Sequence, residues 1–299
     1  MTQTMTDAAA ATDPARDAVP AAAPGKRSRW RIAALTVGAL LFLFPFYYMI
    51  VGSLQKNPDT SLGGVLPMPG NLGLDNYIEI NAAVNLGRTL LNSIIFTAGV
   101  VTGTLVFGVL AGYALAQLHY RGRGTLFAAM LLLQVIPFQL FIIPLYVQIV
   151  RSYGLADSYL GMILPFAINS VAVFIFRQFF LQLPEQLFEA ARIDGASELR
   201  ILRSIALPLV RPALLTATML TFIGPWNEFL WPFLVTKQAD KQPLAVALAN
   251  YISTVAAAAD NPYGAILAGA CVLAAPAVAL FIAFQRHFVS AELGSGVKG

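Results

Sequence analysis

The chain has 299 residues, of which 58% are hydrophobic and only 11% are charged. Soluble globular proteins carry about 25% charged residues, so this composition excludes an ordinary soluble fold and favours a protein embedded in a bilayer. The net charge is +4, and the single cysteine, Cys271, excludes a disulfide within the chain. The two histidines, His119 and His287, are far apart in sequence, so no metal site is predicted.

The N-terminal segment differs from the rest of the chain. Residues 1–25 are rich in Ala, Thr, Asp and Pro, so we expect a disordered cytoplasmic tail over residues 1–29. The basic cluster Lys26, Arg27, Arg29 and Arg31 is followed by a long apolar run. This order predicts an uncleaved membrane anchor, because a cleaved signal peptide would begin at once with its basic and apolar regions.

Charge-free windows predict the membrane spans. A transmembrane helix needs roughly 20 apolar residues, and six windows meet this requirement. They are Ile32–Gln55, Thr89–Tyr120, Gly124–Val150, Ser158–Phe176, Pro212–Thr236 (interrupted only by Glu228) and Asn261–Gln285. The predicted fold class is therefore an all-α polytopic membrane protein with six transmembrane helices.

The windows define the predicted organisation. A first transmembrane helix (30–55) is followed by an external loop (56–88), a core domain with five spans (89–285) and a cytoplasmic C-terminal tail (286–299). A further window, Gln242–Ala259, is rich in alanine and has one polar face, which indicates an external or re-entrant amphipathic helix.

The basic residues predict the orientation. With the N-terminus in the cytoplasm, most of the 19 Lys and Arg residues fall in cytoplasmic segments, as the positive-inside rule requires. Both termini are therefore expected in the cytoplasm.

The largest cytoplasmic connection, 177–211, contains two predicted short helices. The first runs through Arg192, and Glu189 is expected to pair with Arg192 one turn away. Gly195 ends this helix, because glycine accepts the left-handed conformation, and Ser197 can cap the second. The expected apolar face of the second helix consists of Leu199, Leu202, Ile205 and Ala206. Chemistry alone predicts a bent amphipathic pair, which would also fit a loop resting on lipid headgroups.

The spacing within this loop carries a resemblance. The residues concerned are Glu189, Ala190, Ala191, Asp194, Gly195, Ala196, Ile205, Leu207 and Pro208. Their pattern resembles the "EAA" loop of binding-protein-dependent ABC importer permeases, which implies the type I permease fold. In that family the loop is the coupling helix that sits in a cleft of a cytoplasmic ATPase.

Shorter matches favour one branch of that family. Phe44–Tyr47, Asn92–Ser93 and Trp226–Phe229 resemble the carbohydrate, maltose-type branch, which implies a sugar or sugar derivative as cargo. The C-terminal Gly296, Val297 and Lys298 resemble a tail that reaches the ATPase pair.

The resemblance also implies partners. They are a homologous second permease subunit, two cytoplasmic ATPase subunits that bind ATP and Mg, and an extracellular or periplasmic solute-binding protein. The location implied is the bacterial cytoplasmic (inner) membrane, in contact with lipid. This chain itself needs no cofactor, and nothing predicts a nucleic-acid partner.

Polar residues within the spans suggest a pathway. At about 100° per residue, Gln134, Pro137, Phe141, Pro144 and Gln148 fall on one side of a continuous third helix. Glutamines can bond sugar hydroxyls and Phe141 can stack on a sugar ring. The neighbours Trp226, Asn227 and Glu228 form a second candidate, since Glu228 is the only charged residue within a predicted span. Both sets also fit purely structural packing.

A missing motif limits the possible functions. No GxxxxGK[ST] phosphate loop occurs, so we expect a transporter subunit rather than an enzyme, with ATP hydrolysis on a separate subunit. Two alternatives remain open. One is a secondary transporter, a class that usually shows internal repeats and ionisable groups near the midplane. The other is a membrane scaffold without transport activity.

Overall fold

The computed structural model describes residues 29–59, 61–258 and 261–295. These residues form helices and connecting loops, with one isolated β-bridge between Gln55 and Leu72. The chain divides into two units, Met1–Tyr47 and Tyr48–Gly299, and helix α1 (Arg29–Leu54) crosses the division. Every site discussed below lies in the second unit. The tail predicted over 1–29 lies, apart from Arg29, outside the described residues.

Three helices are continuous and apolar enough to cross a membrane: α1, α3 (Leu86–Gln117) and α14 (Tyr263–Ser295). They occupy the first, second and sixth predicted windows. Three further candidates are pairs of helices bent at a short break. Counting each pair as one span gives six, which agrees with the predicted number. In the third pair, only the second helix lies in a predicted window, because residues 198–209 belong to the predicted connection 177–211.

The bent pairs differ in angle. Helix α4 (Arg123–Val135) meets the segment 138–152 at 92°. The segment 159–166 meets α7 (Ser170–Leu181) at 51°, and the segment 198–209 meets α11 (Arg211–Asn227) at 80°. The intervening short elements are η3 (Phe138–Phe141), α5 (Ile142–Tyr146), η4 (Val147–Ser152), α6 (Tyr159–Ile163), η5 (Leu164–Phe166) and, after α11, α12 (Leu230–Val235).

The predicted polar stripe assumed a continuous helix over Gly124–Val150, which the structure does not form. Pro137 has no backbone N–H to donate and disfavours helical geometry in the residue before it. Ile136 is accordingly extended, with φ −76° and ψ 122°. The polar residues predicted to share one helical face between Gln134 and Gln148 lie on either side of this 92° bend.

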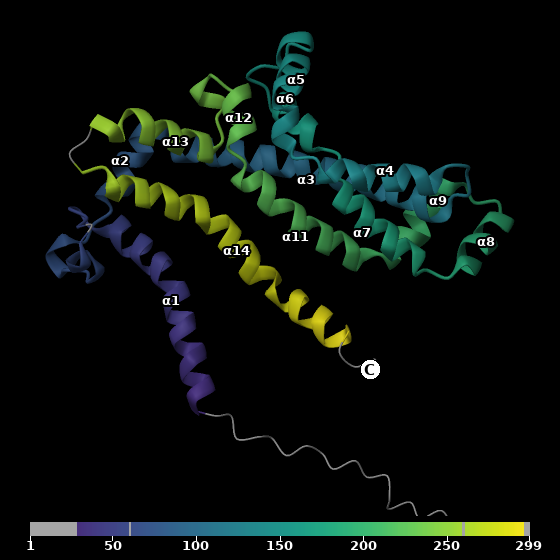
Figure 1. Cartoon of the computed structure of the whole chain (residues 1–299), viewed down its shortest axis with the longest axis horizontal. Coiled ribbons are helices and arrows are strands. Elements are labelled where there is room, and N and C mark those ends of the chain that lie inside the picture. The colour runs from purple at the N-terminus through teal and green to yellow at the C-terminus, as the bar shows by residue number, and fades with distance from the viewer. Residues whose placement is uncertain (1–28, 60, 259–260, 296–299) are drawn as a thin grey trace, which may run out of the picture. The chain divides into compact units, whose positions relative to one another are not determined.

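Helix α3 runs along α4, α7 and α11 (Figure 1). Small residues allow the close approach to α7: a Cβ added at Gly112 would lie 2.6 Å from the Cβ of Phe176. Such close backbone contacts are typical of helix pairs in membranes. Helix α3, which is continuous, is thus packed closely against α7, which is one half of a bent pair.

Two helices outside the spans were only partly anticipated. Helix α2 (Asp75–Val84) lies within the predicted external loop, after η1 (Leu62–Val65) and η2 (Pro69–Asn71). Helix α13 (Leu244–Thr254) has 11 residues and is too short to cross the bilayer core, so a seventh span over the Gln242–Ala259 window is excluded. It lies between η7 (Ala239–Lys241) and η8 (Ala256–Ala258), and shares a buried cluster with α2 and α14.

Candidate functional site

The predicted coupling loop forms two short helices that meet at Gly195. They are α8 (Glu185–Ile193) and α9 (Glu198–Ile201), followed by η6 (Leu202–Ala206) and α10 (Leu207–Leu209). Gly195 has φ +79°, the left-handed conformation expected at the bend. Phe188 and Ala191 are buried in a cluster with residues of α3 and α7, so the loop is packed onto the spans.

Arg192 pairs with a residue other than the expected one. Its Nε donates to Oε1 of Glu198 at 2.7 Å, while Glu189 is exposed. The prediction of a Glu189–Arg192 pair is wrong, because the turn at Gly195 returns the chain and brings the carboxylate of α9 to the guanidinium of α8. The hydrogen bond from Arg192 lowers the pKa of the Glu198 carboxyl, burial opposes this shift, and a bond from Tyr113 supports it.

The loop exposes apolar side chains. Ile193 is 86% exposed and Leu199 is 68% exposed. Leu199 was expected on one apolar face with Leu202 and Ala206, but these two side chains are buried whereas Leu199 is exposed. The other predicted coupling residues are exposed (Ala190, Asp194, Pro208) or half-buried (Ala196, Ile205, Leu207).

A second feature is a cavity of about 450 Å³ where three helix breaks meet. They are the bends after α4 and before α7 described above, and the interruption between α11 and α12. It is lined by Ile136 and Pro137 at the end of α4, by Ile168 and Asn169 before α7, and by Glu228 after α11. Helix α4 is 13 residues long, or about 20 Å, which is shorter than the depth of roughly 30 Å of the bilayer core. Irregular backbone within the bilayer core is tolerated where it is buried in protein or lines a water-filled cavity.

Local chemistry explains two of these breaks. The side-chain oxygen of Asn169 accepts hydrogen bonds from the N–H groups of Val171 and Ala172, at 2.9 and 3.2 Å, and so caps α7. Oε1 of Glu228 accepts a bond of 3.1 Å from the N–H of Trp231 in the first turn of α12. A carboxylate at a helix N-terminus is also stabilised by the helix dipole.

The cavity is lined by six polar side chains that come from α3, α4, α7, α11 and the breaks. They are Thr104, Gln134, Asn169, Ser170, Thr221 and Glu228. Glu228 is the only one that carries a charge, and neither Lys nor Arg lines the cavity within the described part of the chain. This arrangement offers hydroxyl and amide groups to a polar solute.

Only some of the predicted pathway residues meet here. Gln134 and Glu228 line the cavity, whereas Phe141 and Gln148 lie beyond the bend, on η3 and η4. Trp226 is buried and donates from Nε1 to the carbonyl of Leu273 in α14 at 2.9 Å.

Asn227, the remaining candidate, bonds its own helix through the carbonyl of Ile223 at 3.0 Å. Sequence reasoning missed Thr104, Asn169, Ser170 and Thr221, although the Asn-Ser pair at 169–170 carries a recognisable helix-start signal.

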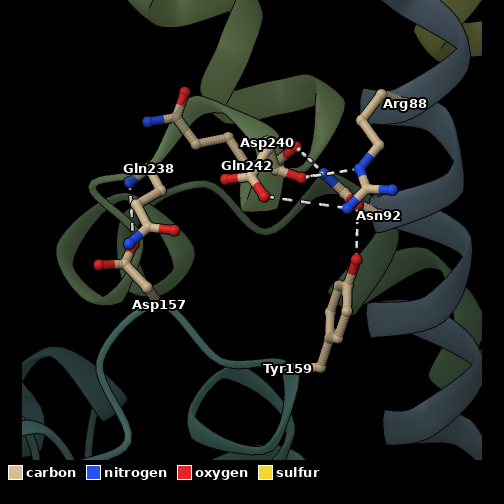
Figure 2. A network of polar contacts seen from close by, with 7 residues as sticks. All are labelled: Arg88, Asn92, Asp157, Tyr159, Gln238, Asp240 and Gln242. Carbon is tan, nitrogen blue, oxygen red and sulfur yellow. Dashed lines mark hydrogen bonds and ion pairs between the residues drawn. The ribbon is translucent and has the colours of Figure 1, made fainter.

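Near the N-terminal end of α3, a network of hydrogen bonds holds the loop that follows α12 (Figure 2). Asn92 is fully buried, and its Nδ2 donates to the carbonyls of Asp240 and Gln242, both at 2.9 Å. The hydroxyl of Tyr159 donates to its Oδ1 at 2.7 Å. Asp157 accepts bonds from the N–H groups of Lys237 and Gln238. The loop is thus held mainly through its backbone.

Comparison with known proteins agrees with this arrangement. The family described as "Binding-protein-dependent transport system inner membrane component" matches residues 104–291. The arabinooligosaccharides transport system permease protein of Halalkalibacterium halodurans is 36% identical over 272 residues, 89% of this chain and 96% of that protein. The sn-glycerol-3-phosphate transport system permease protein of Yersinia pestis is 31% identical, over 85% of this chain and 92% of that protein.

A solved structure is similar as well. It is a bacterial ABC transporter involved in the import of the acidic polysaccharide alginate, with a TM-score of 0.74 and 25% identity over 87% of this chain and 95% of that chain. Together, the helical fold, the match over residues 104–291 and the nearly full-length relatives show that this chain belongs to the family of binding-protein-dependent inner-membrane transport components, and is the permease subunit, not the ATPase, of an ABC importer.

Proposed function

We propose that this subunit forms half of the pathway of an importer for a sugar or sugar derivative. The other half is a homologous permease subunit, and two cytoplasmic ATPase subunits that bind ATP and Mg supply the energy. A solute-binding protein delivers the cargo on the external side. The excess of Lys and Arg in the predicted inner connections supports cytoplasmic N- and C-termini, and the permease names of the relatives support a carbohydrate cargo.

The observation that carries this proposal is the convergence of three helix breaks on one polar cavity. Discontinuous helices near the midplane commonly build transport sites. The amide of Gln134 and the hydroxyl of Ser170 are suited to sugar hydroxyls. Among the described residues, the only charged group that lines the cavity is the carboxylate of Glu228. This carboxylate would repel an anion, so we propose that the part of the pathway formed by this subunit binds a neutral cargo.

The cytoplasmic loop is the proposed ATPase contact. Ile193 and Leu199 expose apolar surface beside the exposed backbone of Gly195, and an apolar surface that extends beyond the spans is typical of a protein contact. Glu189, Ala190, Ala191, Asp194, Gly195, Ala196, Ile205, Leu207 and Pro208 complete the proposed coupling segment. The proposed tail contact through Gly296, Val297 and Lys298 lies outside the described residues.

Reconstitution tests the proposal. The permease pair, the ATPase pair and the solute-binding protein are placed in proteoliposomes, and uptake of arabino-oligosaccharides and glycerol 3-phosphate is measured. We expect uptake of the neutral sugar that requires ATP and persists when ionophores collapse the ion gradients. Uptake that follows the ion gradient without ATP would indicate a secondary transporter, and absence of any uptake with an intact complex would favour a scaffold.

A further inference from the structure

Helix α3 connects three features of this subunit without interruption. It carries Tyr113 and Gln117 beside the cytoplasmic loop, Thr104 at the cavity, and Asn92 in the external network. Helices α4 and α11 end beside the cavity, and α7 begins beside it. A shift of any of those three helices along its axis would be taken up at the break in that helix. Helix α3 is continuous, so it transmits such a shift from one end to the other.

The cytoplasmic attachment of α3 is made by Tyr113. Its hydroxyl donates to Oε2 of Glu198 at 2.6 Å, and its ring packs against Phe180 of α7 and Phe188 of α8, with centroids 5.5 and 6.3 Å apart. One side chain of α3 therefore contacts both helices of the loop. A hydrogen bond to a carboxylate is stronger than one between neutral groups. This contact therefore resists both the separation and the closer approach of α3 and α9.

Glu198 is held from two sides. Its other oxygen, Oε1, accepts the bond from Arg192, and Nη2 of Arg192 reaches the carbonyl of Gln117 at 3.3 Å. The Gln117 side chain in turn donates to the carbonyl of Phe180 at 2.6 Å. We name this group of four residues, Tyr113, Gln117, Arg192 and Glu198, the clamp. It joins α8 and α9 to the end of α3 and to α7.

The external attachment of α3 is Asn92, 21 positions before Tyr113 and so about 31 Å away along the helix. Its two bonds to the loop carbonyls are supplemented by Ser93, whose hydroxyl accepts from the N–H of Leu244 at 2.9 Å. Figure 1 shows α3 extending from the end beside α2 and α13 to the end beside α9. The two attachments lie at opposite ends of one straight element.

We propose that α3 is the element that carries motion of the coupling loop to the external loop, and that Tyr113 is the positioning residue through which the motion enters α3. This inference rests on the proposed coupling role of the loop. When ATPase closure displaces α8 and α9, the clamp makes α3 follow, and Asn92 moves loop 237–244 with it. The external opening of the cavity then follows the state of the ATPase.

The test uses the full complex in proteoliposomes. Tyr113→Phe keeps the packed ring and removes only the hydroxyl, and Glu198→Gln removes the charge from the same bond. The matched control is Tyr251→Phe, which loses a hydroxyl bond of 2.9 Å to the carboxylate of Glu79 and lies outside the path from the loop through α3 to Asn92. ATP hydrolysis and sugar uptake are measured on the same samples.

A second readout follows the cavity itself. With Cys271→Ser as background, Ser170→Cys introduces a thiol at the cavity lining, and an impermeant maleimide is added outside with and without ATP and vanadate. We expect Tyr113→Phe and Glu198→Gln to hydrolyse ATP, to import about tenfold less sugar per ATP, the factor expected for one bond to a charged group, and to lose the ATP-dependent rise in labelling.

The outcomes separate this inference from the proposed function. Unchanged coupling and labelling in both clamp variants would overturn the role of Tyr113, while wild-type uptake would leave the proposed function intact. An equal loss in Tyr251→Phe would also overturn it, because removing a tyrosine hydroxyl bond outside the path would then have the same effect as removing one within it. So would failure of both clamp variants to assemble, which would assign the clamp a purely structural role. A wild-type complex without ATP-dependent uptake would instead refute the proposed function.

Discussion

Arg192 and Glu198 join the two helices of the proposed coupling loop through a hydrogen bond of 2.7 Å between Nε and Oε1. The two residues lie on either side of Gly195, so the bond closes the bend that the glycine makes possible. Both side chains are partly exposed, and an exposed ion pair alone stabilises little. Its significance is geometric, because it fixes the angle between α8 and α9.

This pair predicts a pH dependence. The pKa of Glu198 is lowered, chiefly by Arg192, so the carboxylate stabilises the folded loop above the ordinary carboxyl pKa of about 4.3. The contribution is lost as the pH falls through the lowered value. The difference in thermal midpoint between the wild-type complex and Glu198→Gln should be constant from about pH 8 to pH 5 and shrink below pH 4. A difference that disappears already near pH 6 would contradict the assignment.

The cavity predicts unequal effects for two glutamines. Gln134 lines the cavity, whereas Gln148 is exposed beyond the 92° bend. Gln134→Leu should reduce sugar uptake about tenfold through loss of hydrogen bonds to the cargo, with normal assembly. Gln148→Leu is the matched control and should transport normally. Radiolabelled uptake measured at equal complex content distinguishes them, and equal losses would remove the cavity from the pathway.

The external network predicts a local loss of order. Asn92 is fully buried and bonds two loop carbonyls, so Asn92→Leu should leave the buried carbonyl of Gln242 unpaired at a cost of about 1–3 kcal/mol. Hydrogen exchange of the amides in 237–244 should become faster by one to two orders of magnitude. Arg88→Gln is the control, since Arg88 also bonds the Asp240 carbonyl but lies exposed. Equal protection in both variants would show that the loop is held by other contacts.

Local rules predicted the features that depend on single residues or short windows. The left-handed bend at Gly195, the length of α3 and the number of apolar segments all follow from the composition of short stretches. Pro137 was visible in the sequence as well. Its effect was underestimated, because a proline within a span can either kink the helix or end it, and the packing of neighbouring helices decides between the two outcomes.

Features made by distant segments could not be predicted in this way. The partner of Arg192 depends on how α9 returns after the turn, and Tyr113 reaches Glu198 from 85 positions away in the sequence. The cavity collects Thr104, Gln134 and Thr221 from three helices, and no periodicity within one helix reveals such a set. The predicted stripe on a straight third helix failed for the same reason.

Gly195 offers the most direct test of coupling. Its φ is +79° and a Cβ added there would meet nothing within 4 Å, so Gly195→Asp changes the surface offered to the ATPase without a clash inside the subunit. Gly122 is a matched control, with φ +86° and equally open surroundings, in the turn between α3 and α4. Both variants carry the same added charge and a similar left-handed backbone cost of roughly 1–2 kcal/mol.

The decisive measurement is the number of sugar molecules imported per ATP hydrolysed, determined in the same proteoliposomes for the wild-type complex, Gly195→Asp and Gly122→Asp. We predict that Gly195→Asp stays in the membrane and in the complex but imports at least about tenfold less sugar per ATP, the loss expected when one contact of about 1.4 kcal/mol is removed, while Gly122→Asp keeps the wild-type ratio. A wild-type ratio in Gly195→Asp would contradict the claim that this loop couples ATP hydrolysis to import.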